Sequence, residues 1–158
     1  MQIGFELPKN DDGMINAVPH HIGCAVKQLG NNYVTLAGAF SLNRRTRSFD
    51  IASQHVRVCF VELLDHFYLE LIAPLNDQAK LKRFLEVGFY HLCFLVEDLD
   101  EAREHLRAQK FLALPAFESE AFAGSVCQFF VSPQTHLIEL AQMSIKDFGE
   151  FFRANQET

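Results

Sequence analysis

The chain has 158 residues, of which 49% are hydrophobic, and it carries a formal net charge of −6 at pH 7. This length and apolar content suit one compact core, so we expect residues 1–158 to form a single domain. The negative charge argues against a nucleic-acid partner, and no apolar run is long enough to span a membrane. The N-terminus has no basic start followed by an apolar run, so we expect no secretory signal.

The four cysteines indicate a reducing compartment. They lie within apolar, strand-like segments and show no CxxC spacing: Cys24, Cys59, Cys93 and Cys127. Cysteines in such surroundings usually act as small buried hydrophobic residues rather than as disulfides or zinc ligands. We therefore expect a cytoplasmic protein.

The sequence contains an internal repeat with a spacing of about 70 residues. The segment HHIGCAV, which begins at residue 20, returns as YHLCFLV at residue 90. The segment QHVRVCFV at residue 54 returns as GSVCQFFV at residue 124, and YLEL at residue 68 returns as LIEL at residue 137. Each half therefore carries one histidine near its start and one glutamate near its end.

Hydrophobic periodicity predicts the same order of elements in both halves. Residues 1–17 match nothing in the second half and are expected to form an irregular lead-in. The first half is predicted to contain a strand at 20–27, a helix from 29 to about 40, a short extended segment, and strands at 55–63 and 66–73. A short charged helix over 77–86 then leads to a strand at 89–97, a helix at 98–109, and extended segments at 111–118, 125–132 and 136–142.

These elements predict an α+β fold with two tandem βαβββ modules, at about 19–75 and 88–142. We expect the modules to form one curved mixed β-sheet around a cavity, with the helices outside. A further helix is predicted over about 144–154. It is too apolar to stand free in water, and it could pack on the domain or on a second copy in a homodimer.

Four repeated residues indicate a metal site. A carboxylate in a strand as apolar as the one around Glu70 is costly to bury without a partner, and Glu139 poses the same problem. His21 and His91 lie at matching positions on the first strand of each half. Any one of the four alone is more simply read as a solvent-facing glutamate or an ordinary core histidine. Together they favour a divalent transition metal, such as Co, Ni, Mn, Zn or Fe, over Ca or Mg.

Four segments resemble the vicinal oxygen chelate superfamily, which includes glyoxalases, bleomycin-resistance proteins and dioxygenases. They are HIGCAV at residue 21, YLELIAPL at residue 68, HLCFLVEDL at residue 91 and LIEL at residue 137. Their sequences are most similar to the corresponding segments of methylmalonyl-CoA epimerase. The resemblance covers about residues 19–142 and implies a glyoxalase-like fold.

By this resemblance the metal ligands are His21, Glu70, His91 and Glu139. The repeat assigns His21 independently, because His91 likewise directly precedes an aliphatic residue, and His20 is then the neighbour that does not bind metal. Some epimerases carry a proton-transfer glutamate on the third strand of the first module, where this chain has Val58.

The resemblance implies a metal-dependent epimerase or isomerase that works by proton abstraction next to a carbonyl, through a metal-chelated enediolate. The expected substrate is an acyl thioester or a 2-oxo acid. Because glyoxalase-like members are thought to use a ligand glutamate as the base, the base could be Glu139 or Glu70, and Glu139 is the predicted catalytic residue. A glyoxalase-I-like lactoylglutathione lyase and a small-molecule binding or resistance protein remain alternatives.

Overall fold

The computed structural model describes residues 15–157, so residues 1–14 of the expected lead-in lie outside the described residues. The first half contains β1 (Ala17–Ala25), α1 (Leu29–Phe40), β2 (Arg45–Thr46), β3 (Phe49–Ile51), the 3₁₀ turn η1 (Ala52–Gln54), β4 (Val56–Leu64) and β5 (Phe67–Pro74). After η2 (Lys80–Phe84), the second half contains β6 (Phe89–Val96), α2 (Leu99–Ala108), β7 (Leu112–Ala113), β8 (Phe117–Ser119), η3 (Glu120–Phe122), β9 (Ser125–Val131) and β10 (Leu137–Gln142). The chain continues into α3 (Ile145–Ala154) and β11 (Gln156–Glu157).

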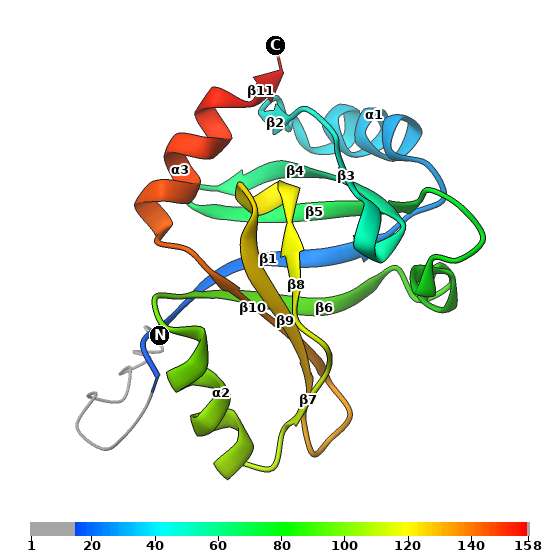
Figure 1. Cartoon of the computed structure of the whole chain (residues 1–158). Helices are drawn as coiled ribbons and strands as arrows, with labels where there is room; N and C mark the ends of the chain where they lie inside the picture. Colours follow the sequence, from blue (N-terminus) through cyan, green and yellow to red (C-terminus); the bar gives the residue numbers. More distant parts are fainter. Residues whose placement is uncertain (1–14, 158) are drawn as a thin grey trace, which may run out of the picture.

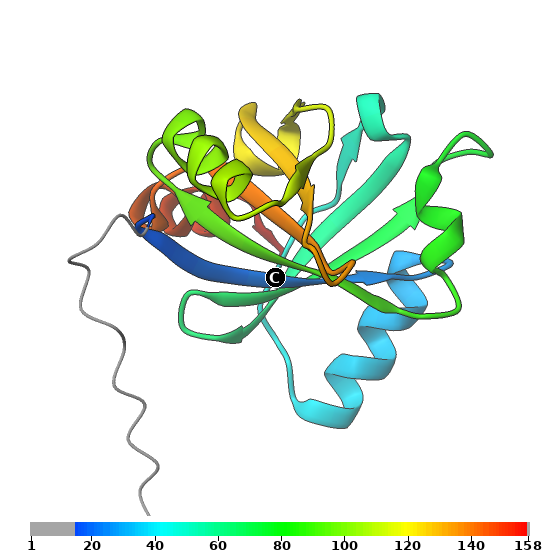
Figure 2. The ribbon, with the colours of Figure 1, turned by 90° about the horizontal axis from the view of Figure 1, so that it is seen from below.

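The strands form one mixed sheet in the order β11-β2-β4-β5-β1-β6-β10-β9-β7, with β3 paired to β4 and β8 paired to β9. At its centre β1 runs parallel to β5 and β6 runs parallel to β10, while β1 and β6, one strand from each half, are antiparallel. Figure 1 shows the strongly curved sheet, and Figures 1 and 2 show α1 and α2 on opposite outer sides of it. The predicted fold of two βαβββ modules is confirmed.

The outer faces of the central strands are apolar and pack against the helices. Next to α1, Val26 joins a buried cluster with the strand residues Leu69 and Leu71. Next to α2, the buried cluster combines Val96 with Leu99 on the helix. Alternation along a strand then directs the other side chains to the concave inner face.

Two predicted helices differ in detail from the observed ones. The helix predicted from 29 to about 40 is α1, but its last residue, Phe40, is 69% exposed, and Ser41 after it adopts the left-handed conformation. The segment expected as a helix over 77–86 is a 3₁₀ helix over Lys80–Phe84 only. Gly88, at φ +78°, ends it by donating its N–H to the Phe84 carbonyl at 2.9 Å, and β6 begins one residue later. No helix within residues 15–157 is long and apolar enough to cross a membrane.

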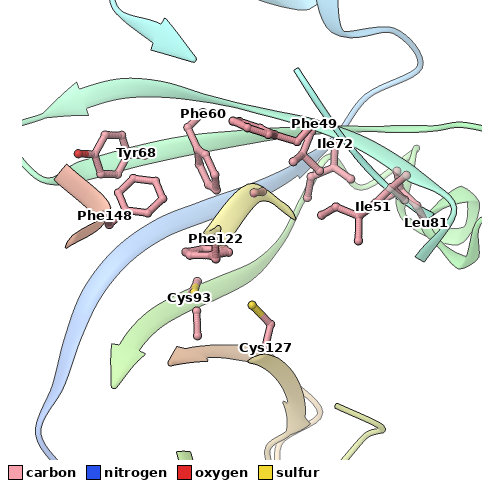
Figure 3. Packing of buried hydrophobic residues seen from close by; sticks show 14 of the residues in the cluster. Phe49, Ile51, Phe60, Tyr68, Ile72, Leu81, Cys93, Phe122, Cys127 and Phe148 are labelled. Atoms are coloured by element: carbon pink, nitrogen blue, oxygen red, sulfur yellow. The ribbon is translucent and has the colours of Figure 1, made fainter. Parts of the chain in front are cut away.

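The largest core cluster lies on the concave face and is rich in aromatic side chains (Figure 3). Phe148 of α3 reaches into this cluster, where its ring lies 5.1 Å from that of Phe60 and 5.4 Å from that of Phe122. Cys59, Cys93 and Cys127 are buried, and every cysteine of the described residues is unpaired. The inner face is therefore filled by aromatic rings on the side that α3 covers.

Candidate metal centre

The structure brings His21, Glu70, His91 and Glu139 together on the concave face. Each comes from a different one of the four central strands, namely β1, β5, β6 and β10. All four side chains are buried, with exposed fractions of 0 to 5%. The strand register explains this convergence, because in each row of the sheet one histidine and one glutamate flank a single residue.

The residue between the two candidate ligands of each row is small. Gly23 lies between Glu70 and His91, and the repeat-equivalent Cys93 lies between His21 and Glu139. A methyl group built on Gly23 would lie 1.9 Å from Cε1 of His91, 2.2 Å from its Nδ1 and 2.6 Å from its Nε2. The imidazole of His91 therefore occupies the space that any larger residue at position 23 would need.

We expect Gly23→Ala to displace His91 and to weaken divalent-metal binding by at least about 100-fold, since a misplacement on the order of 1 Å can cost that much at a functional site. A titration with Co²⁺ would measure the change. Gly38→Ala is the matched control, because nothing lies within 4 Å of a methyl group built there. It should leave metal affinity unchanged and stabilise α1 by up to about 1 kcal/mol. Wild-type affinity in Gly23→Ala would refute this role for the glycine.

The spacing of the donor atoms fits a metal ion. Nε2 of His21 lies 2.9 Å from Nε2 of His91, 3.1 Å from Oε2 of Glu70 and 3.2 Å from Oε2 of Glu139. Nε2 of His91 lies 3.2 Å from Oε2 of Glu139 and 3.5 Å from Oε2 of Glu70. Two ligands that are each about 2.1 Å from an ion lie about 3.0 Å apart at a right angle and about 3.4 Å apart at a tetrahedral angle. The observed distances fall in the range expected for four ligands around one common centre.

Hydrogen bonding within the protein does not satisfy this cluster. Although Oε2 of Glu139 is near both imidazoles, no hydrogen bond of acceptable geometry reaches it from the described residues. A buried carboxylate oxygen without such a partner is costly. Two neutral imidazoles and two carboxylates are ligands that suit a divalent transition metal, so the residues present fit such an ion.

When metal is absent, protonation of the histidines offsets the negative charge of the two carboxylates. Burial lowers the pKa of His21, but the nearby carboxylates of Glu70 and Glu139 more than offset this effect and raise the pKa to about 9. The pKa of His91 is raised for the same reasons. Burial would raise the pKa of Glu70 and of Glu139, but the two imidazoles lower both below the ordinary value. Metal binding must therefore displace protons from the histidines.

These shifts predict how the stability of the metal-free protein depends on pH. Because the pKa of His21 is raised, its contribution is fully present below the unfolded value of about 6.5 and is lost as the pH rises through about 9. We expect a loss of about 2 kcal/mol between pH 7 and pH 8.5, or roughly 4–8 °C in Tm. The pKa of His20 is lowered, mainly by burial. His20 therefore costs the folded protein stability, but only as the pH falls below the unfolded pKa of a histidine.

Differential scanning calorimetry of the metal-free and Co²⁺-loaded forms would check this expectation. Coordination requires deprotonated histidines, so the Co²⁺-loaded form should not share the loss of stability. Equal slopes of Tm against pH in the two forms would contradict the assigned charges.

His20, predicted as the neighbour that does not bind metal, is also buried on the inner side. Adjacent residues on a regular strand point to opposite faces, but the pairing of β1 with β6 is shifted between Pro19 and His21. Such a bulge turns an extra residue toward the same side. As a result, Nδ1 of His20 lies 2.8 Å from Nδ1 of His21, and neither ring is exposed.

A cavity of about 480 Å³ opens beside the cluster, and Glu70, His91 and Glu139 are among the residues that line it. Its walls are largely apolar and include Val58, at the position where some epimerases carry a glutamate. Tyr90, the repeat equivalent of His20, also lines the cavity. Burial and the nearby carboxylates raise the pKa of Tyr90 well above its ordinary value, so its hydroxyl stays protonated.

Two cations at the cavity were not singled out by the sequence analysis. Lys80 and Arg83 lie on η2 and line the cavity with exposed side chains. In the sequence they belong to a charged segment with no other signal. Only the tertiary fold places that segment at the site. The denser basic group of the chain lies elsewhere: Arg44 pairs with Glu62, Arg45 pairs with Glu157, and Arg47 bonds to Asn155 beside α3.

The family model described as the glyoxalase/bleomycin resistance protein/dioxygenase superfamily matches residues 20–129, which include His21, Glu70 and His91. No match was found among curated proteins. A hypothetical protein from Bacillus halodurans C-125 superposes with a TM-score of 0.72 at 20% identity, over 82% of this chain and 96% of that one.

Methylmalonyl-CoA epimerases have the same fold. The enzyme from Mycobacterium tuberculosis superposes with a TM-score of 0.71 at 22% identity, over 85% of this chain and 92% of that one. A variant of the Streptomyces coelicolor enzyme, in complex with 2-nitronate-propionyl-CoA, gives a TM-score of 0.69 at 20% identity, over 81% and 94% of the two chains. At these identities the likeness extends to the fold, whereas the family model matches the sequence itself over most of its length. The chain therefore belongs to the glyoxalase/bleomycin resistance protein/dioxygenase superfamily.

Proposed function

We propose that the protein is a divalent-metal-dependent epimerase or isomerase that moves a proton next to a carbonyl group of a small acid or thioester. The observation that carries this proposal is the meeting of His21, Glu70, His91 and Glu139 at the cavity. Members of the superfamily that only bind a ligand have little use for four buried metal ligands, two of them carboxylates. The complete set therefore favours catalysis over sequestration.

The four side chains would hold the ion, and the bound ion would draw electron density from substrate oxygens and so acidify the neighbouring C–H bond. Glu139 would take the proton from that carbon. Its Oε2 atom accepts no well-formed hydrogen bond from the described residues, and the residue lines the cavity. Val58 offers no alternative base, and Tyr90, held neutral, offers a hydroxyl that can donate a hydrogen bond or a proton.

The cavity suits a substrate with an apolar body and an anionic group. More apolar than polar side chains line its walls, while Lys80 and Arg83 add positive charge at exposed positions. Within residues 15–157 neither cation forms a salt bridge, so both are available to a carboxylate or phosphate. Epimerases with this fold hold methylmalonyl-CoA or 2-nitronate-propionyl-CoA, which supports an acyl thioester as the substrate class.

A glyoxalase-type reaction is the second candidate, and the apolar residue Val58 favours it. A single ligand glutamate can remove a proton and return it to the adjacent carbon, which gives an isomerised product. Epimerisation instead needs the proton to return on the opposite face of the same carbon. The two reactions therefore differ in which carbon of the product carries solvent deuterium.

Deuterium-exchange NMR tests the proposal. The purified protein would first be analysed for bound metal, loaded with Co²⁺, and incubated in D₂O with a panel of acyl thioesters and 2-oxo acids. We expect metal-dependent incorporation of deuterium next to a carbonyl in at least one substrate class. The absence of exchange throughout the panel, with metal bound, would favour a binding protein instead.

A further inference from the structure

The residue before each ligand histidine differs between the two halves of the repeat. In the second half it is Tyr90, which lines the cavity, and Nδ1 of His91 has no hydrogen-bond partner among the described residues. In the first half it is His20, whose Nδ1 lies 2.8 Å from Nδ1 of His21. Of the two ligand histidines, His21 alone thus has a hydrogen-bond partner on the ring nitrogen that faces away from the cluster.

We propose that His20 is a positioning residue that fixes the tautomer and the ring orientation of His21 for metal binding. This inference rests on the proposed metal centre. A histidine that binds metal through Nε2 must carry its proton on Nδ1. At His21 that proton needs an acceptor, and the nearest one is the lone pair on Nδ1 of His20. Partners of this kind orient a ligand histidine and strengthen it as a donor to the metal.

The assignment places the proton of His20 on its other ring nitrogen. If Nδ1 of His20 accepts, its proton must lie on Nε2, which has no hydrogen-bond partner within residues 15–157. An unpartnered buried polar group costs about 1–3 kcal/mol, so its presence needs an explanation. If Nδ1 of His20 instead donated a hydrogen bond to Nδ1 of His21, the His21 proton would have to lie on Nε2. That atom points at the other three ligands.

The surroundings of His20 hold its ring in this orientation. Four aromatic rings lie around it, at centroid distances of 5.6 Å for Phe60, 5.0 Å for Tyr68, 5.4 Å for Phe122 and 4.0 Å for Phe148. The Phe148 ring is perpendicular to it, at 82°, an arrangement in which an N–H edge can face a π surface. Figure 3 shows these four side chains gathered on one side of the inner face, beside α3.

Three variants test this role, with Co²⁺ alone as the probe. His20→Leu keeps an apolar side chain but removes the acceptor, and it should weaken Co²⁺ binding by about 10- to 100-fold and alter the d–d absorption spectrum. His20→Asn can offer its Oδ1 atom in place of Nδ1 and should stay within about threefold of the wild type. Phe148→Leu loosens the aromatic surroundings without touching the acceptor, so it should lower Tm but keep Co²⁺ affinity.

Wild-type affinity in His20→Leu would overturn the inference, and so would equal losses in His20→Leu and His20→Asn, or in His20→Leu and Phe148→Leu. Failure of the wild type itself to bind Co²⁺ would refute the metal centre rather than the role of His20. A second measurement does not depend on the folding of any variant. In the ¹⁵N NMR spectrum of the Zn²⁺-loaded wild type, His20 should carry its proton on Nε2 and His21 on Nδ1. The opposite tautomer at either residue would overturn the inference.

Discussion

His91→Ala should abolish tight metal uptake and, with it, any proton exchange into substrate. The change removes one of the two proposed nitrogen ligands and leaves two buried carboxylates with a single imidazole between them. Loss of a partner outside the ligand set typically costs 10–100-fold in metal affinity, so loss of a ligand should cost at least about 100-fold. Metal content measured by mass spectrometry after exhaustive dialysis would give the stoichiometry of the variant and of the wild type.

His136→Ala is the matched control for this variant. His136 is exposed and lies just before β10, close in sequence to Glu139. Its replacement should leave both metal content and exchange unchanged. Full metal stoichiometry in His91→Ala would show that His91 is not a ligand. A loss of metal in His136→Ala would indicate that the loop before β10 takes part in metal binding.

Glu139→Asp should keep most of the metal yet lose most of the solvent-deuterium exchange. The shorter side chain can still offer a carboxylate, but it would place the base about one methylene farther from the substrate carbon. A displacement on the order of 1 Å can cost about 100-fold in rate. The rate of deuterium incorporation at saturating substrate, divided by the amount of bound metal, is the quantity to compare.

Glu70→Asp makes the same change at the other carboxylate. Both glutamates line the cavity and both lie near the two imidazoles, so the pair separates the role of ligand from that of base. If Glu139 is the base, Glu70→Asp should retain clearly more exchange per bound metal than Glu139→Asp. The reverse order would assign the base to Glu70, and wild-type exchange in Glu139→Asp would leave Glu139 as a ligand only.

Much of the fold could be predicted because the sequence repeats. Matching strands with a histidine at the start and a glutamate at the end predicted two modules in one sheet, and the antiparallel pairing of β1 with β6 is what joins them. The four predicted ligands are brought together because alternation along a strand fixes which side chains share a face. The repeat thus carried information that composition alone could not.

Other features depend on tertiary geometry that periodicity does not encode. The bulge in β1 turns His20 inward beside His21, although simple alternation places neighbours on opposite faces. Close approach of the His91 ring requires a glycine at position 23, which in sequence looks like any other small residue. Lys80 and Arg83 reach the cavity through the fold of η2.

X-ray absorption spectroscopy of the Co²⁺-loaded protein tests the central claim most directly. If His21, Glu70, His91 and Glu139 form one centre, the spectrum should show only nitrogen and oxygen ligands at about 2.0–2.2 Å, with the outer-shell scattering of two imidazoles. His91→Ala, if it binds any Co²⁺, should show one imidazole fewer. A sulfur ligand at about 2.3 Å, or a shell without imidazole, would contradict the proposed site.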